Sequence, residues 1–261
     1  MKARRSCLIV IPARGGSTGI INKNLKEVHG FTLIQRTFAH AQILSEGEMP
    51  ICISTDSIEI LESLNFCFNL DIDVSILRLD SLVKCGEIYI HFRSAAKASS
   101  TTLISENLFD IYTAYLNLGE RVDGILLLQP TTPFRSKREL IEIKEFAQLN
   151  VSKKASLVSV TKVDDIHPAR MYSQISNSRA RSLKGFKKSY YSRRQDLPMI
   201  FIRDGGFYLI GADLLKKRLQ YLRKPHIKVR EYPWSINIDS DIDLLQAQST
   251  PSELLTDDPS E

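Results

Sequence analysis

The stretch that decides the fold is Cys7-Leu-Ile-Val-Ile-Pro-Ala-Arg-Gly-Gly-Ser-Thr-Gly-Ile-Ile-Asn-Lys-Asn24. It opens with a short apolar run rich in β-branched side chains and then breaks at Pro12 and at Gly15-Gly16. Continuous apolar runs of this length, bounded by turn residues, are typical of buried strands in parallel sheets. Residues 31–44 then place apolar side chains at helical spacing. The stretch therefore predicts a strand, a glycine-rich loop and a helix.

The same alternation of strands and helices continues along the chain. Further strands are predicted at 51–53, 87–92, 124–128 and 156–160, and further helices at 57–64, 105–118 and 137–149. This order predicts an α/β domain with a largely parallel sheet and right-handed crossovers. Within residues 65–84, Leu70, Ile72, Val74 and Ile76 alternate with polar residues, and this alternation predicts an extra strand.

Composition and the positions of polar segments predict the domain boundaries. The chain has 261 residues, of which 43% are hydrophobic and 25% charged, and these values exclude collagen-like, coiled-coil and mostly disordered proteins. We predict one domain over residues 1–248, with a polar, basic arm at about 162–200 inserted in it, and a disordered tail at 249–261. No apolar stretch approaches the ~18–20 residues of a membrane span. With four cysteines and no C-x-x-C pair, we predict a cytoplasmic protein.

The loop after the first strand has the composition of an anion site. Gly15 and Gly16 allow the backbone to approach a phosphate closely, and consecutive N–H groups form an anion-binding nest. Arg14 and Lys23 add two positive charges, in a chain whose net charge is +5. The loop has neither the G-x-G-x-x-G fingerprint nor the Gly-Lys-Ser/Thr of a P-loop. It predicts phosphate binding of another type, with an ordinary solvated turn as the alternative.

Five segments, in order, resemble the motifs of the CMP-sialic acid synthetases (acylneuraminate cytidylyltransferases). The first is similar to the family signature A-R-x-x-S-K-G-I-x-x-K-N-L, and the others are 53–56, 126–135, 194–198 with 204–208, and 235–244. Together the matches span residues 7–246. The resemblance implies a Rossmann-like nucleotidyltransferase fold, a mostly parallel twisted sheet with helices on both faces, and a dimerisation arm.

The resemblance also implies a reaction, in which CTP and a nonulosonic (sialic-like) acid give a CMP-sugar and pyrophosphate. CTP carries about four negative charges and the sugar carboxylate adds one, so the site must supply cations. On the family pattern Arg14 and Lys23 hold the triphosphate, and Mg²⁺ bound by Asp239 and Asn237 bridges phosphate oxygens. The implied catalytic residues are Arg14, Lys23 and Asp239.

The family pattern places substrate contacts around these groups. The implied substrate-binding residues are Gly15, Gly16, Ser17, Asn24, Arg93, Gln129, Arg170, Arg194 and Asp204. Gln129 is suited to donate and accept hydrogen bonds beside the sugar. Arg170 and Arg194 fall in the arm, from which the family lends basic side chains to the neighbouring subunit's sugar pocket. We therefore expect a homodimer, with no nucleic-acid and no membrane partner.

Four positions depart from the family pattern. Thr18 stands in place of the signature Lys, and Asn237 in place of the first Asp of a D-x-D metal pair. Both changes remove charge from the same phosphates. Ser100 replaces the usual Asp, and Asp204 replaces the usual Asn before Gly-Gly.

Other functions remain open at this point. One is a Kdo-type cytidylyltransferase, although Lys23-Asn-Leu follows the sialate pattern rather than the Kdo pattern S-x-R-x-P-G-K-P-L. Another is a catalytically weak nucleotide- or sugar-binding homologue. A third is a nucleic-acid-binding module that uses the basic, tyrosine-containing residues 179–194.

Overall fold

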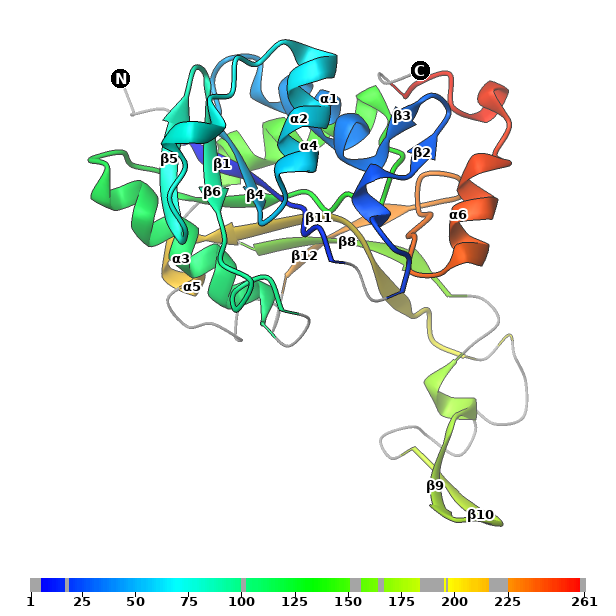
Figure 1. Ribbon diagram of the computed structural model, residues 1–261. Coiled ribbons are helices and arrows are strands. Elements are labelled where there is room, and N and C mark those ends of the chain that lie inside the picture. The colour runs from blue at the N-terminus through cyan, green and yellow to red at the C-terminus, as the bar shows by residue number, and fades with distance from the viewer. Residues whose placement is uncertain are drawn as a thin grey trace.

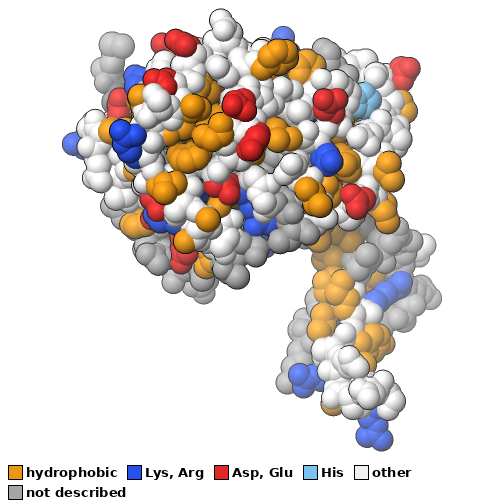
Figure 2. Space-filling view, in the orientation of Figure 1, with side chains coloured by type: hydrophobic (Ala, Val, Ile, Leu, Met, Phe, Trp, Pro, Cys, Tyr) orange, Lys and Arg blue, Asp and Glu red, His pale blue; other side chains and the backbone are white. Residues whose placement is uncertain are grey.

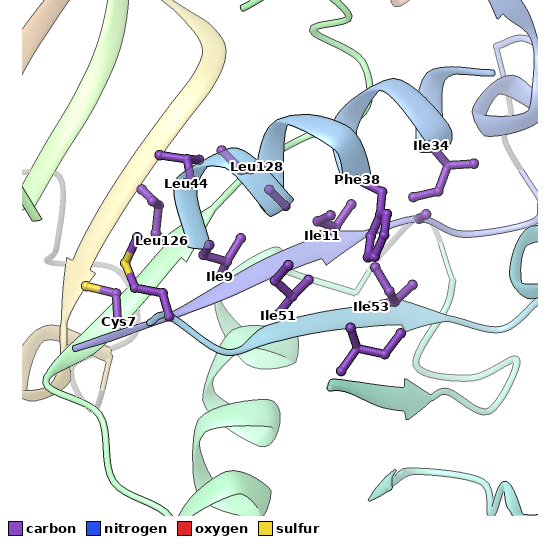
Figure 3. Packing of buried hydrophobic residues seen from close by; sticks show 14 of the residues in the cluster. Cys7, Ile9, Ile11, Ile34, Phe38, Leu44, Ile51, Ile53, Leu126 and Leu128 are labelled. Carbon is purple, nitrogen blue, oxygen red and sulfur yellow. The ribbon is translucent and has the colours of Figure 1, made fainter. Parts of the chain in front are cut away.

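Strand β1 (Cys7–Pro12) lies at the centre of the fold and separates two apolar cores. Leu8, Ile9, Val10 and Ile11 have no exposed surface. Since side chains alternate along a strand, Cys7, Ile9 and Ile11 enter one core while Leu8 and Val10 enter the other. Figure 3 shows the first core, where Phe38 lies beside Ile11 and Ile53. Burial on both faces explains why this strand is apolar at every position.

The structure, a computed structural model, describes residues 6–16, 19–99, 102–150, 156–163, 167–183, 195, 197–215 and 225–258. In these residues the main sheet has the strand order β12-β8-β11-β7-β1-β4-β6-β5 (Figure 1). The other strands are β4 (Ile51–Thr55), β5 (Ser81–Cys85), β6 (Ile88–Phe92), β7 (Gly124–Leu127), β8 (Ser156–Lys162), β11 (Phe201–Gly211) and β12 (His226–Arg230). Strands β11 and β5 run antiparallel to their neighbours, and every other pair is parallel. The sheet is therefore mixed but mostly parallel.

Helices cover both faces of this sheet, as predicted. The first core contains side chains of α1 (Leu33–Ser45), α2 (Ile58–Phe68) and α4 (Lys137–Asn150). The second contains side chains of α3 (Ile104–Asn117) and α5 (Ala212–Leu215). Figure 1 shows the two groups of helices on opposite sides of the sheet. No helix in the described ranges is long and apolar enough to cross a membrane.

A third core lies beside the carboxyl ends of the central strands. Strands β2 (Glu27–Val28) and β3 (Phe31–Thr32) form a hairpin that contributes Val28 to this core. Helix α6 (Asp241–Gln248) contributes Leu244, and Phe134 and Ile238 pack against both. The hairpin turns at His29 and Gly30, which both have positive φ. The predicted helix 31–44 therefore begins later, at Leu33, where Thr32 and Gln35 form a capping box.

The extra strand predicted within residues 65–84 is present but lies later in the segment than the alternation indicated. Helix α2 continues to Phe68, and Asn69 and Asp71 then adopt left-handed conformations. The Asp73 carboxylate accepts the Ser75 backbone N–H at 2.9 Å and starts the short 3₁₀ helix η2 (Val74–Ile76). Local side-chain hydrogen bonds of this kind compete with strand formation. The strand is β5, which pairs with β6 at the edge of the sheet.

The predicted arm contains a projecting hairpin. Strands β9 (Tyr172–Ser176) and β10 (Arg179–Ser182) pair antiparallel, and η3 (Pro168–Arg170) precedes them. The hairpin extends away from the domain (Figure 1), and hydrophobic and basic side chains lie along the arm (Figure 2). The role of the arm in dimerisation stays a prediction.

The tail, predicted to be disordered, is ordered over residues 249–258. A 3₁₀ helix, η6 (Ser252–Leu254), leads into Leu255, which is fully buried in the third core. The residues after Leu255 contact the first residue of α4, where the Lys137 N–H donates to the Asp257 carbonyl at 2.6 Å. The Asp258 side chain is buried among basic groups. The polar composition of this segment therefore serves buried ionic contacts and helix contacts.

Candidate functional site

A cavity of about 450 Å³ opens where β1, β6 and β7 end. Six of the predicted site residues line it: Arg14, Lys23, Asn24, Arg93, Gln129 and Asp239. A second hollow of about 340 Å³ is lined by Gly15 and Gly16 and shares Arg14 and Asn24 with the first. The carboxyl edge of a parallel sheet is the usual ligand site in this fold class. The predicted residues come from segments more than 200 positions apart in the sequence, and the fold brings them together here.

The glycine-rich loop is held from two sides. The Gly15 N–H donates to an Asp56 carboxylate oxygen at 2.9 Å, and the buried Asn24 amide donates to the Arg14 carbonyl at 2.8 Å. A Cβ at Gly15 would lie 2.9 Å from the Ser57 Cβ, so only glycine fits this close approach. Asn24 therefore positions the loop backbone, while the Arg14 guanidinium stays at the cavity wall.

Lys23 and Asp239 meet at the mouth of the cavity. Lys23 Nζ donates to the Ile238 carbonyl at 2.9 Å and lies 3.2 Å from Asp239 Oδ1. The second oxygen of Asp239 accepts the Asn237 amide at 2.7 Å. The Asp239 side chain is 70% exposed, whereas that of Lys23 is 14% exposed. A cation and an open carboxylate therefore stand side by side where phosphates would enter.

Asp239 has the chemistry of a shared metal ligand. No group of three His, Cys, Asp or Glu side chains that could hold an ion alone occurs in the part of the chain that the structure describes. The Asp243 carboxylate is engaged at the start of α6, where it accepts from Asp239 N at 3.0 Å and from Ser240 N at 2.8 Å. Mg²⁺ is commonly bound by one or two carboxylates together with substrate phosphates and water. The donor set fits that arrangement.

Arg93 lines the cavity from β6 and is itself buried. Its Nη2 donates to the Ser54 carbonyl at 3.3 Å, while Nε has no hydrogen-bond partner among the described residues. Burial lowers the pKa of this guanidinium. A buried donor without a hydrogen-bond partner carries a desolvation cost. Arg93 is therefore prepared for an acceptor supplied by a ligand.

Behind Arg93 lies a buried polar cluster. His91 Nδ1 is 3.0 Å from Ser54 Oγ, and the Asn107 amide donates to the same oxygen at 3.2 Å. Burial, with smaller contributions from the charges of Arg93 and Lys97, lowers the pKa of His91 to about 4. His91 is therefore neutral at physiological pH, and Ser54 is buried too deeply to act as a nucleophile.

The buried, neutral His91 should make the free energy of unfolding fall at acid pH. The unfolded chain binds a proton at this imidazole near its ordinary pKa of 6.5, whereas the folded protein resists protonation until about pH 4. The free energy of unfolding should therefore fall between pH 6.5 and pH 4, by up to about 3 kcal/mol. His91→Asn retains a polar partner for Ser54 but does not titrate. Urea unfolding across this range should show a shallower pH dependence for the variant, and equal slopes would contradict the assignment.

Two predicted substrate residues do not reach the cavity. Asp204 is 5% exposed and accepts hydrogen bonds from Ser159 Oγ and from Gly206 N, and its other oxygen lies 3.7 Å from Arg230. Its carboxylate compensates a buried arginine, which explains why an acid occupies this position. Asp204 lines neither hollow, and its contact with a substrate stays a prediction. Arg170 is exposed in η3 and lines neither hollow. Ser17, Thr18, Ser100 and Arg194 lie outside the described residues.

Sequence reasoning missed a set of buried arginines behind the cavity. The side chains of Arg36, Arg135 and Arg230 are fully buried. Arg135 Nη2 donates to the Gln129 carbonyl at 2.9 Å, and both Nε and Nη2 donate to the Gly206 carbonyl. Arg135 thus ties the loop after β7 to β11. The available signal was the position of Arg135 at the end of the Gln129–Arg135 motif.

The sequence of this region is similar to known proteins. Residues 8–78 match the family described as "Cytidylyltransferase". The chain is 29% identical over 156 residues to the CMP-N,N'-diacetyllegionaminic acid synthase of Legionella pneumophila, covering 60% of this chain and 58% of that protein. It is 32% identical over 180 residues to the N-acylneuraminate cytidylyltransferase of Escherichia coli, covering 66% of this chain and 36% of that protein. The matches thus span less than two thirds of either relative's length.

A third relative and a solved structure widen this comparison. The 3-deoxy-manno-octulosonate cytidylyltransferase of Parabacteroides distasonis is 25% identical over 225 residues, covering 81% of this chain and 77% of that protein. The structure of a CMP:2-keto-3-deoxy-manno-octonic acid synthetase complexed with CTP superposes with a TM-score of 0.58 at 14% identity, over 94% of this chain and 100% of that one. This last likeness is one of fold. The match to the family described as "Cytidylyltransferase" covers residues 8–78, so the part of the chain that is similar to this family includes the glycine-rich loop at the cavity.

Proposed function

We propose that this protein is a Mg²⁺-dependent cytidylyltransferase that couples CTP to a nonulosonic acid and releases pyrophosphate. The observation that carries the proposal is the meeting of Arg14, Lys23, Asp239 and Gln129 around one cavity at the carboxyl edge of the sheet. Two cations and an exposed carboxylate suit a triphosphate with its metal ion, and a neutral amide suits a sugar. The relatives that act on legionaminic acid and on acylneuraminate support the same substrate class by name.

The proposed reaction needs no nucleophile from the protein. The anomeric hydroxyl oxygen of the sugar bonds to the α-phosphorus of CTP as the bond from that phosphorus to the pyrophosphate oxygen breaks, and the hydroxyl proton is lost to solvent. Arg14 and Lys23 offset the charge of the triphosphate, so that an anionic sugar can approach and the leaving pyrophosphate is stabilised. A metal ion, when bound, would supply a further positive charge between phosphate oxygens.

The residues around Asp239 support Mg²⁺ rather than a softer ion. Asp239 would be the charged ligand and Asn237 would contribute its side-chain oxygen after the amide rotates from the hydrogen bond it now makes. Oxygen ligands of this type are those that Mg²⁺ prefers. The remaining positions would be completed by phosphate oxygens and water, because Asp243 is engaged at the start of α6.

The arm completes the proposal. Arg170 and Arg194 would bind the sugar carboxylate of a neighbouring subunit in a homodimer, since a guanidinium matches a carboxylate in a two-point contact. In favour, η3 and the β9–β10 hairpin project from the domain and carry exposed basic side chains (Figure 2).

Asn237→Asp is expected to strengthen metal binding. The change adds a second negative charge beside Asp239, whose oxygen is 2.7 Å from the Asn237 amide nitrogen. The Mg²⁺ concentration that gives half of the maximal rate should fall about tenfold, because the charge of the ligands sets the affinity of such sites. The measurement is a Mg²⁺ titration of the initial rate for both proteins. An unchanged midpoint would show that position 237 does not face the metal.

The substrate class is tested by pyrophosphate release from CTP with a panel of sialic, legionaminic and pseudaminic acids and Kdo. We expect the highest kcat/KM with one of the nonulosonic acids. Highest turnover with Kdo would assign the protein to the other class of acid, to which the Parabacteroides distasonis relative belongs by name. Binding of CTP without turnover of any acid would contradict the proposed enzyme.

A further inference from the structure

Arg135 is a fully buried cation beside the loop that carries Gln129 into the cavity. Its guanidinium lies 5.6 Å from the centre of the Phe207 ring and bonds the carbonyls of Gln129 and Gly206. The neighbouring Gly205 fits against the Gln129 side chain, where an added Cβ would lie 3.1 Å from Oε1. The position of Gln129 in the cavity therefore depends on where Arg135 stands.

A buried guanidinium must be held and compensated. Burial lowers the pKa of Arg135 to about 9, so the group is still charged at neutral pH. Its fourth contact is His40, whose Nδ1 is 3.4 Å from Arg135 Nη1. On the other side of the same ring, His40 Nε2 is 2.9 Å from Asp258 Oδ1. His40 thus lies between Asp258 and Arg135.

The contacts of His40 determine which of its two ring nitrogens carries the proton. Burial lowers the pKa of His40, so the ring is neutral and carries one N–H. A carboxylate accepts and an arginine donates, so the proton must be on Nε2, facing Asp258, and Nδ1 must accept from Arg135. The second oxygen of Asp258 faces Arg36 Nη1 at 3.6 Å and the Arg135 backbone N–H at 3.4 Å. The Asp258 carboxylate therefore contacts the Arg135 backbone N–H directly, and it reaches the Arg135 guanidinium by way of His40.

We propose that Asp258, acting through His40 and Arg135, is a positioning residue for the substrate loop Gln129–Thr132. The inference rests on the proposed function, because it assigns this loop to the sugar side of the cavity. It gives the segment after α6 a role at the site: the segment crosses the start of α4 and places one carboxylate behind the loop. In metal sites a carboxylate that accepts from a histidine fixes the orientation of that ring, and here the Asp258–His40 pair contacts an arginine in place of a metal ion.

The test compares Asp258→Asn with Asp257→Asn. Asp258 faces His40 with one carboxylate oxygen and Arg36 and the Arg135 backbone N–H with the other. Asparagine replaces one of these two oxygens with an NH2 group, which donates and therefore cannot accept from the donor that it faces. The second variant alters an adjacent carboxylate that accepts the Arg138 N–H, and its amide oxygen can still accept. In Asp258→Asn we expect hydrogen exchange in residues 129–135, including the Thr132 N–H bonded to the Gln129 carbonyl, to quicken about tenfold. In the same variant, the hydrogen exchange of β4 should match that of the wild-type protein. In Asp257→Asn, hydrogen exchange should match the wild type in every segment.

Kinetics separates positioning from general destabilisation. Asp258→Asn should raise KM for the sugar acid about tenfold while KM for CTP changes less than about twofold. Unchanged exchange at 129–135, or exchange that quickens equally in β4, would overturn the inference. A wild-type protein that turns over no acid would instead contradict the proposed function, and the exchange comparison would still decide whether Asp258 holds the loop.

Discussion

Replacing Asp239 with asparagine is expected to slow pyrophosphate release from CTP by about 10²–10³-fold, which is the size of effect that loss of one preorganised group stabilising transition-state charge has in other enzymes. Asp239 is the one carboxylate among the described residues that line the cavity. The change preserves shape but removes the negative charge that would bind Mg²⁺ and that now holds Lys23 at 3.2 Å. Initial rates across a range of Mg²⁺ concentrations would measure the effect, and higher Mg²⁺ should restore part of it.

Asp241→Asn is the matched control for this experiment. Asp241 is two residues further on, in the exposed first turn of α6, and does not line the cavity. Its loss should change the rate less than about twofold, since exposed charges act weakly at a distance through water. Equal losses in the two variants would show that the site responds to general negative charge rather than to a ligand at position 239.

Replacing Arg135 with methionine is expected to lower the free energy of unfolding by about 3–5 kcal/mol, because it leaves the buried carbonyls of Gln129 and Gly206 without their donor and removes a positive charge that compensates nearby buried carboxylates. The guanidinium has no exposed surface, bonds two carbonyls and contacts His40, and Asp258 and Glu139 lie within its electrostatic reach. Methionine fills the space but satisfies none of these groups. The total stability of a domain is about 5–15 kcal/mol, so the loss is large.

Urea unfolding of Arg135→Met and of Arg138→Met measures this contribution. Arg138 is one turn further on in α4, pairs with Glu142 at 2.9 Å and is 84% exposed. Its replacement should cost no more than about 0.5 kcal/mol. If Arg135→Met does not fold, Arg135→Lys provides the comparison, because it retains the charge but loses the two-carbonyl contact. Equal stabilities of the two methionine variants would contradict the buried network.

The sequence predicted the fold where hydrophobic spacing dominates. The central strands and the helices of both faces are present, because β1 and its neighbours are buried on two sides and the helices on one. The misplaced extra strand has a local cause. Alternation at 70–76 was a strand signal, but Asn69 and Asp71 adopt left-handed conformations, and the side chains of Asn65 and Asp73 accept from the backbone N–H groups of Ile72 and Ser75. Side-chain to backbone hydrogen bonds therefore decided this segment against the hydrophobic pattern.

The candidate site was predictable from the sequence for the residues that line the cavity, but not for the buried charged residues that contact each other behind it. Arg14, Lys23, Gln129 and Asp239 come together as the motif order implied. Asp204 was expected beside the substrate but lies against Arg230, because that arginine is buried on β12. Buried charge of this kind leaves no periodic signal in a sequence, since basic residues are ordinarily expected at the surface.

The most direct test of the account uses CTP labelled in its α-phosphate. Incubated with Mg²⁺ and a nonulosonic acid, the wild-type protein should transfer the label to a CMP-sugar, with one pyrophosphate released for each product formed. Asp239→Asn should form the same product far more slowly. Label that stays in CTP with every acid of the panel, under conditions in which CTP binds, would contradict the claim that this cavity catalyses cytidylyl transfer.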